Sequence, residues 1–195
     1  MSLKINNLTK KFGDRVILEN FSYSFDDVGI YAITGASGIG KTTLLRIIAG
    51  LDEGFSGTVA DGGRERVSVC FQEYRLFPEL SALDNVALAC FNKPSKENYT
   101  ECINMLSRLG FTSSDMKLMP RELSGGMRQR VSLARAFIRQ RPILLLDEAT
   151  KELDPAHVKG VLDIIKELSL TRLVLLITHS ESDLTYLSPK AIITL

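Results

Sequence analysis

The sequence lacks any apolar run long enough to cross a membrane as a helix. Its most apolar segments, residues 143–146, 173–177 and 191–195, are far shorter than the roughly 20 residues that such a helix needs. They predict buried strands instead. The first six residues also lack the apolar stretch of a signal peptide, so we expect a protein that is not secreted.

The net charge is close to zero, and cysteines are few. The net charge is only +1, which is no sign of the strongly basic face that a nucleic-acid partner would require, so we expect no nucleic acid to bind. The three cysteines, Cys70, Cys90 and Cys102, show no paired metal-ligand spacing, and their odd number is typical of reduced thiols in the cytosol. There is no internal repeat and no low-complexity tract.

What is present is an alternation of strand and helix patterns. Residues 2–34 predict short strands that form an N-terminal antiparallel β layer. The apolar segments after Pro142 alternate with an amphipathic helix, a pattern typical of a mainly parallel sheet covered by helices. We therefore expect an α/β fold in one domain, residues 1–195. Residues 1–73 and 141–195 form its core, and residues 74–140 form an inserted helical lobe.

A glycine-rich segment follows the strand predicted at 30–34 and precedes a helix predicted at 42–49. Two glycines with four residues between them, Gly35 and Gly40, are followed by Lys41 and Thr42, and they match the phosphate-binding loop of P-loop NTPases at every fixed position. The loop amides and the helix N-terminus would hold the phosphates of ATP, and the Thr42 hydroxyl suits Mg²⁺. The alternative is an ordinary glycine-rich turn. The expected nucleotide-binding residues are Gly35, Ala36, Ser37, Gly38, Ile39, Gly40, Lys41, Thr42 and Thr43.

Two acidic residues end the strand predicted at 143–146. Asp147 and Glu148 would lie at the carboxyl edge of a parallel sheet, where such sheets bind ligands. Asp147 is placed to hold Mg²⁺, and Glu148 to polarise the water that attacks the γ-phosphate. The alternative is that both acids only cap the turn that follows.

The segment Leu123-Ser124-Gly125-Gly126-Met127 precedes a helix that bears Arg128, Gln129 and Arg130. With these motifs, the whole chain resembles the ABC transporter ATPase family. The resemblance implies that Ser124, Gly125 and Gly126 contact the γ-phosphate of ATP bound to a second subunit. It also implies a head-to-tail dimer, with two identical chains or two different ones as partners.

Three further residues match family positions. Phe12 occupies the place of the aromatic that stacks on adenine, and the alternative is a core aromatic. Gln72 is similar to the family glutamine that reaches the metal and the attacking water. His179 is similar to the histidine that hydrogen-bonds the γ-phosphate, and the alternative is a structural histidine. The resemblance thus implies Lys41, Gln72, Glu148 and His179 as catalytic residues, and Thr42, Gln72 and Asp147 as ligands of Mg²⁺.

The chain departs from the family pattern at three positions. Met127 stands where the family usually has glutamine, a variant that resembles the taurine, sulfonate and nitrate importers. Lys151 and Glu152 replace two small residues in a loop that faces the partner subunit. These two charged residues put tight dimer packing at this loop in question.

The resemblance implies the ATP-hydrolysing subunit of a membrane transporter, located in the cytoplasm on the inner face of the cell membrane. Integral-membrane subunits would be its partners, with a solute-binding protein in the complex. Residues 75–80 would form the groove for a membrane subunit, or else part of the lobe core. The alternative function is a soluble ABC ATPase that acts on a partner outside the membrane.

Overall fold

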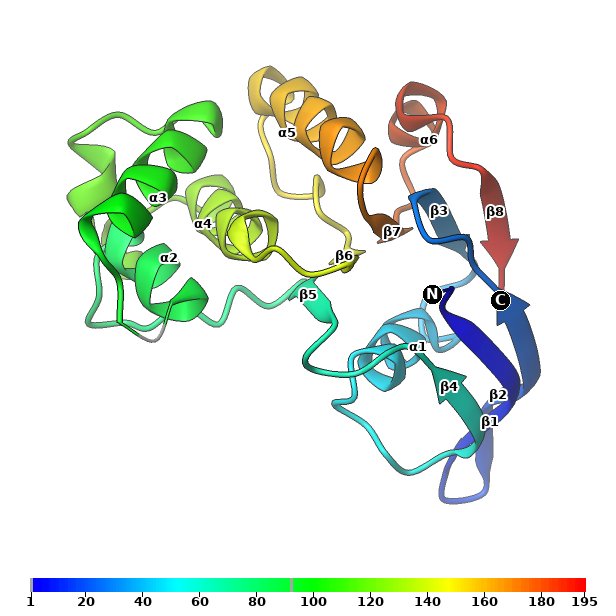
Figure 1. The fold of residues 1–195 in the computed structure, drawn as a ribbon. Coiled ribbons are helices and arrows are strands. Elements are labelled where there is room, and N and C mark those ends of the chain that lie inside the picture. Colours follow the sequence, from blue (N-terminus) through cyan, green and yellow to red (C-terminus); the bar gives the residue numbers. More distant parts are fainter. Residues whose placement is uncertain (1, 92) are drawn as a thin grey trace. The chain divides into compact units, whose positions relative to one another are not determined.

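The computed structural model describes residues 2–91 and 93–195. The chain divides into two compact units. The core unit comprises Met1–Val69, Arg141–Glu148 and Lys166–Leu195, and the helical unit comprises Cys70–Gln140 and Ala149–Ile165. Figure 1 shows the elements of both units along the chain.

An antiparallel sheet of three strands belongs to the core unit. β1 (Lys4–Phe12) is its central strand and pairs with β2 (Arg15–Ser24) on one side and β4 (Ser56–Ala60) on the other (Figure 1). Both pairings are irregular near Asn7, whose φ is +49°. Beyond that irregularity, Leu8 and Lys10 point into the protein while Lys11 is exposed.

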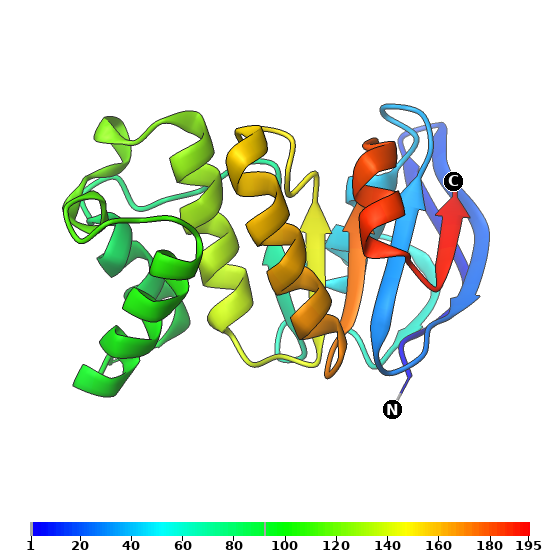
Figure 2. The same cartoon turned by 90° about the horizontal axis from the view of Figure 1, so that it is seen from above.

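A second sheet has five strands in the order β5-β6-β7-β3-β8, and β3 pairs in parallel with β7 and β8, as β6 does with β7. Figure 2 shows β7, β3 and β8 side by side. Every residue of β6 and β7 is buried, because parallel strands are covered on both faces. The strands are β3 (Gly29–Thr34), β5 (Val67–Cys70), β6 (Ile143–Asp147), β7 (Leu173–Ile177) and β8 (Ala191–Thr194).

The helices of the core unit follow strands of the second sheet. α1 (Lys41–Ile48) follows β3, and α6 (Glu181–Leu187) follows β7. α5 (Pro155–Ser169) begins in the helical unit and ends in the core unit. None of the helices formed by the described residues has the length and apolar character needed to span a membrane.

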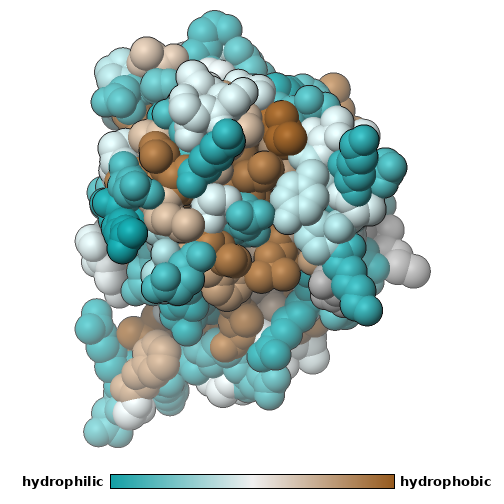
Figure 3. Space-filling model, turned by 90° about the vertical axis from the view of Figure 1, so that its left-hand side faces the viewer, coloured by the Kyte–Doolittle hydropathy of each residue, from teal (hydrophilic) through white to brown (hydrophobic). Residues whose placement is uncertain are grey.

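The helical unit contains α2 (Ala82–Cys90), α3 (Lys96–Arg108) and α4 (Gly125–Ile138), and the short turns η1 (Asp115–Lys117) and η2 (Pro120–Glu122). Serine residues cap the N-termini of α2, α3 and α4 through their side chains. Figure 3 shows hydrophobic residues among hydrophilic ones on the face turned to the viewer.

The predicted α/β class with a parallel sheet and an antiparallel layer is confirmed. Two details differ from the sequence-based expectation. β3 is not part of the antiparallel layer but lies between β7 and β8 in the parallel sheet. The antiparallel layer instead takes β4, which the turn at 61–63 separates from β5 in the other sheet.

Candidate nucleotide-binding site

The glycine-rich loop connects the end of β3 to the start of α1. Gly35, Gly38 and Gly40 all have positive φ angles, of 137°, 75° and 119°. A Cβ on Gly40 would lie 2.6 Å from Ile17 Cγ2, so another residue there would displace the Ile17 side chain and would also strain the backbone. The residues between Gly35 and Gly40 are exposed. The loop therefore presents its backbone to solvent in front of a helix N-terminus.

Lys41 lies at the first position of α1, with its side chain folded back onto the loop. Its Nζ donates to the carbonyl oxygens of Gly35 and Ala36, both at 2.9 Å, and the residue is only 7% exposed. No side chain caps the N-terminus of α1, and its first turn contains no acidic residue. Free amides and a buried lysine at one helix N-terminus favour an anion such as phosphate.

Thr42 and Asp147 bring two oxygen ligands together beside this loop. The Thr42 hydroxyl donates to Asp147 Oδ2 at 2.6 Å, which joins α1 to the end of β6. Across residues 2–91 and 93–195, no three His, Cys, Asp or Glu side chains gather closely enough to hold a metal ion. A site with one hydroxyl and one carboxylate from the protein suits Mg²⁺, because this ion prefers oxygen ligands and keeps bonds to water and phosphate.

Glu148 and His179 lie at the ends of adjacent strands. Glu148 follows β6 and has φ = +52°, and its backbone N–H donates to Ile177 O at 2.9 Å. The His179 Nε2 atom, just beyond β7, is 3.8 Å from Glu148 Oε1. The Glu148 side chain is 16% exposed and that of His179 is 50% exposed. The core unit thus brings the loop, Asp147, Glu148 and His179 to the same edge of its parallel sheet.

Phe12 ends β1, and the residue is 55% exposed. This exposure is at odds with the alternative that Phe12 is a core aromatic. One face of the ring is not free, because Lys10 Nζ lies 4.6 Å from the ring centroid. The ring is therefore supported on one side by a cation and open to solvent elsewhere.

Gln72 belongs to the helical unit, in the segment between β5 and α2, and it is exposed. The same segment contains Tyr74 and Arg75. Its backbone is tied to α4, because Arg135 Nη1 donates to the carbonyl oxygen of Arg75 at 2.9 Å and to that of Tyr74 at 3.3 Å. The role of Gln72 toward a metal stays a prediction.

Ser124, Gly125 and Gly126 form the N-terminus of α4 in the helical unit. The Ser124 Oγ atom accepts the backbone N–H of Met127 at 3.2 Å, so Ser124 is the N-cap. A Cβ on Gly126 would lie 2.9 Å from the carbonyl oxygen of Glu152. The loop after Glu148 therefore packs directly on these glycines. α4 also holds this loop through Gln129, which donates to Ala149 O at 3.1 Å.

Glu152 places a carboxylate beside the same glycines. Its Oε2 atom lies 3.1 Å from the point that a Cβ on Gly125 would occupy, and it accepts a hydrogen bond from the Tyr74 hydroxyl. Burial and this bond raise the pKa of Tyr74 to about 12, so Tyr74 remains a donor at neutral pH. The Arg128 guanidinium lies 5.7 Å from the Tyr74 ring centroid.

Sequence reasoning missed two of these arrangements. No pattern indicates that Lys10 lies against Phe12, although an alternating strand does place residues i and i+2 on one face. The contact between Tyr74 and Glu152 joins two loops that are 78 residues apart, and neither loop has a periodic pattern.

Comparison with known proteins identifies the family of this chain. A family profile described as "ABC transporter" matches residues 18–151. The aliphatic sulfonates import ATP-binding protein SsuB of Bacillus cereus is 36% identical over 99% of this chain and 81% of its own length. The thiamine import ATP-binding protein ThiQ of Photobacterium profundum is 36% identical over 96% of this chain and 84% of its own length.

A solved structure has the same fold. It is the dimeric post-hydrolysis state of the ATP-binding cassette MJ0796 with ADP and Pi, at a TM-score of 0.89 and 29% identity, covering 99% of this chain and 94% of that one. We conclude that this chain belongs to the ABC transporter family and is an ATP-binding ATPase cassette of that family.

Proposed function

We propose that this chain is the ATP-hydrolysing subunit of an importer, acting on the cytoplasmic face of a membrane through separate membrane subunits. The observation that carries the proposal is the set of Lys41, Thr42, Asp147, Glu148 and His179 at one edge of the parallel sheet. Relatives named for import of sulfonates, thiamine and Fe(3+) match at 35 to 36% identity. They support an import ATPase without favouring one solute.

Hydrolysis in this site follows from the position of each group. Lys41 and the amides at the start of α1 bind the outer phosphates and neutralise their charge. Thr42 and Asp147, with Gln72 as a further proposed ligand, would hold Mg²⁺, which would supply positive charge to the phosphates. Glu148 polarises a water that attacks the γ-phosphorus, and the bond from that phosphorus to the bridging oxygen breaks to give ADP and phosphate. His179 donates to the γ-phosphate.

We also propose that two copies associate head to tail around ATP. Each chain carries two elements suited to phosphate, the loop before α1 and the Ser124–Gly126 segment at the start of α4, and they lie in different units. A related cassette has been solved as a dimer with ADP and Pi. The second element would bind the γ-phosphate held by the other copy, so ATP would join the two chains.

The dimer predicts that the specific rate of ATP hydrolysis rises with protein concentration. The rate per chain is expected to increase with concentration at saturating MgATP until the dimer is the main species, because a single chain lacks half of each site. Phosphate release at a series of protein concentrations measures this. A rate per chain that is constant over a roughly hundredfold dilution, with a monomeric mass in the presence of ATP, would show that one chain suffices.

Glu152 provides a second test of the same dimer. A γ-phosphate at Gly125 would meet the Glu152 carboxylate, so like-charge repulsion opposes association. We expect Glu152→Gln to tighten ATP-dependent association by about threefold or more. Glu101→Gln on α3, an exposed carboxylate elsewhere in the helical unit, is the matched control and should change nothing. Equal dissociation constants for the parent chain and Glu152→Gln would argue against a phosphate at this position.

Residues 75–80 are the proposed contact with a membrane subunit. Phe77 is 46% exposed, so it is not part of the lobe core, and the Arg135 guanidinium lies 5.8 Å from its ring centroid. Asn85 holds the backbone of the segment through bonds to Phe77 N at 2.7 Å and to Phe77 O at 3.0 Å. An exposed aromatic on a fixed backbone is typical of an interface.

Purification from membranes separates the importer from a soluble ATPase. We expect the tagged parent chain to co-purify, in mild detergent, with a protein that has several membrane spans. Phe77→Ala should lose that protein while the isolated chain hydrolyses ATP at an unchanged rate, because Phe77 belongs to neither phosphate-binding element. If the parent chain instead co-purifies only with soluble proteins, the alternative function gains support.

A further inference from the structure

Lys10 is a buried cation for which the proposed reaction has no use. Only 5% of the residue is exposed, whereas Phe12, two positions along the same strand, is 55% exposed. Burying an ammonium group is costly unless it is paired and hydrogen-bonded. Its surroundings therefore show what holds it in place.

The Lys10 ammonium is bound by the segment that follows α1. Its Nζ donates to Asp52 Oδ1 at 2.7 Å and to Gly54 O at 2.8 Å. The same Asp52 oxygen accepts the backbone N–H of Gly54 at 3.1 Å, so the turn closes around the ammonium. Hydrogen bonding to Lys10 lowers the pKa of Asp52, which keeps this carboxylate charged.

The same ammonium also contacts the Phe12 ring, 4.6 Å from its centroid, which is within the range of a cation–π interaction. Lys10 thus connects the ring at the end of β1 to the residues just after α1. α1 is the helix whose N-terminus bears Lys41 and Thr42. One buried side chain therefore fixes the aromatic ring relative to the phosphate-binding helix, all within the core unit.

We propose that Lys10 is a positioning residue for ATP, holding Phe12 so that adenine can stack on the ring while the triphosphate lies on α1. This rests on the proposed ATPase function and on the role that the family resemblance implies for Phe12, which is stacking on adenine. Loss of the ammonium frees the ring to turn, so binding of the base weakens while binding of the phosphates does not. Loss of the Lys10 ammonium should therefore lower the affinity for ATP and leave the rate of the chemical step unchanged.

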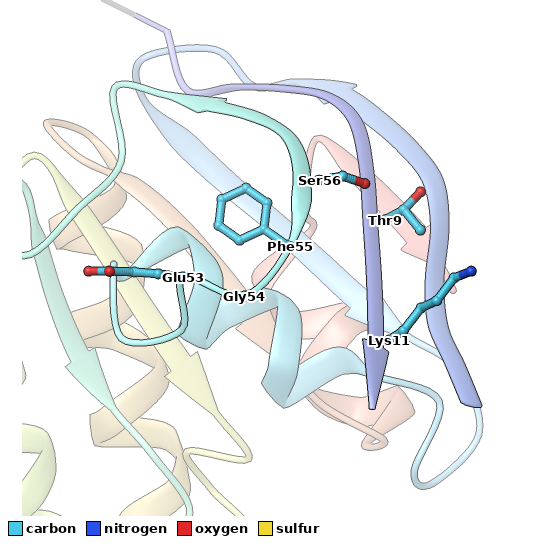
Figure 4. Close-up of a pocket in the computed structure, with 6 residues that line it drawn as sticks. All are labelled: Thr9, Lys11, Glu53, Gly54, Phe55 and Ser56. Carbon is cyan, nitrogen blue, oxygen red and sulfur yellow. The ribbon is translucent and has the colours of Figure 1, made fainter. Parts of the chain in front are cut away.

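The neighbouring Lys11 offers a matched control. It lies on the opposite face of β1 and lines an open hollow of about 390 Å³ together with Thr9 and residues 53–56. Figure 4 shows Thr9 and Lys11 on β1 beside the segment that contains Gly54 and Phe55. Removing the charge of Lys11 changes the net charge of the protein by the same amount as removing that of Lys10, but it leaves the cation beside Phe12 in place.

The experiment measures steady-state hydrolysis in the full chain. Lys10→Met is expected to raise KM for ATP about fivefold, the size of one partly exposed cation–π contact, with kcat within about twofold of the parent. Lys11→Met should leave both constants unchanged. Lys10→Arg, which keeps a cation that can pair with Asp52, should restore most of the affinity. Should Lys10→Met fail to fold, Asp52→Asn tests the same link and should raise KM by a smaller factor.

Two readouts separate positioning from a structural role. In a Phe12→Ala background, which itself should raise KM, Lys10→Met should add no further increase, since it acts through the ring. Inorganic tripolyphosphate, which has no base, should inhibit the parent and Lys10→Met equally. The inference would be overturned by an unchanged KM for Lys10→Met or for Phe12→Ala. It would also be overturned if the two substitutions raised KM additively, or if Lys10→Met weakened the binding of tripolyphosphate in parallel. Absence of hydrolysis in the parent chain would instead count against the proposed function.

Discussion

Replacing Glu148 with glutamine is expected to lower the rate of ATP hydrolysis at least about 100-fold while ATP binding stays within about threefold of the parent. Glutamine keeps the size of the side chain but cannot polarise the attacking water as a carboxylate does. The loop, Lys41 and Thr42 are untouched, so binding of the phosphates persists. Because hydrolysis is then too slow to separate the two chains, the proposed dimer should accumulate with ATP. Phosphate release and the mass in solution measure the two effects.

Glu181→Gln is the matched control for this substitution. Glu181 is an exposed carboxylate in the first turn of α6, in the same unit as Glu148, and its side chain is not part of the site. Its rate should equal that of the parent chain. If Glu148→Gln retains more than about a tenth of the parent rate, another group polarises the water, and the role given to Glu148 is wrong.

Gly57→Ala is expected to give the largest loss of stability, about 3 kcal/mol in the free energy of unfolding. Gly57 lies in β4 with φ = +92°, and a Cβ there would lie 2.5 Å from the carbonyl oxygens of both Asn6 and Asn7. Those atoms belong to the backbone of β1, so the side chain cannot be accommodated by a change of rotamer. Denaturant unfolding of the two proteins measures the difference.

Gly13→Ala separates the contribution of the backbone angle from that of the clash. Gly13 also has a positive φ, of +58°, but no atom lies within 4 Å of the point that its Cβ would take. We expect a loss of only about 1 kcal/mol, from backbone strain alone. Equal losses of unfolding free energy for the two variants would show that the backbone of β1 near Asn7 can move to accept the new Cβ without loss of stability.

Much of the site was predictable because its chemistry depends on local order along the chain. The glycine loop needs only a strand before it and a helix after it. Asp147, Glu148 and His179 end strands that turned out to be neighbours, and parallel strands bring their carboxyl ends to one edge. Spacing and alternation are enough to locate such residues.

The remainder depends on which elements pair and how loops pack, and no local pattern encodes either. The residues of β3 indicate a strand, but not that its partners are β7 and β8, some 140 and 160 positions further on. The sequence shows that Glu152 replaces a small residue of the family pattern. Its contact with Tyr74 is not predictable in the same way, because it arises from tertiary packing. No sequence pattern indicates that Lys10 is buried, because its partner Asp52 lies 42 positions further along the chain.

The left-handed backbone at Glu148 has a consequence for protein engineering. A residue other than glycine pays roughly 1 kcal/mol for such an angle, and glycine adopts it freely. Selecting variants for heat resistance alone would therefore favour glycine at this position and discard the carboxylate. Stabilisation of this chain should leave position 148 unchanged and draw its gains from sites such as exposed helix surfaces, where stability and turnover do not conflict.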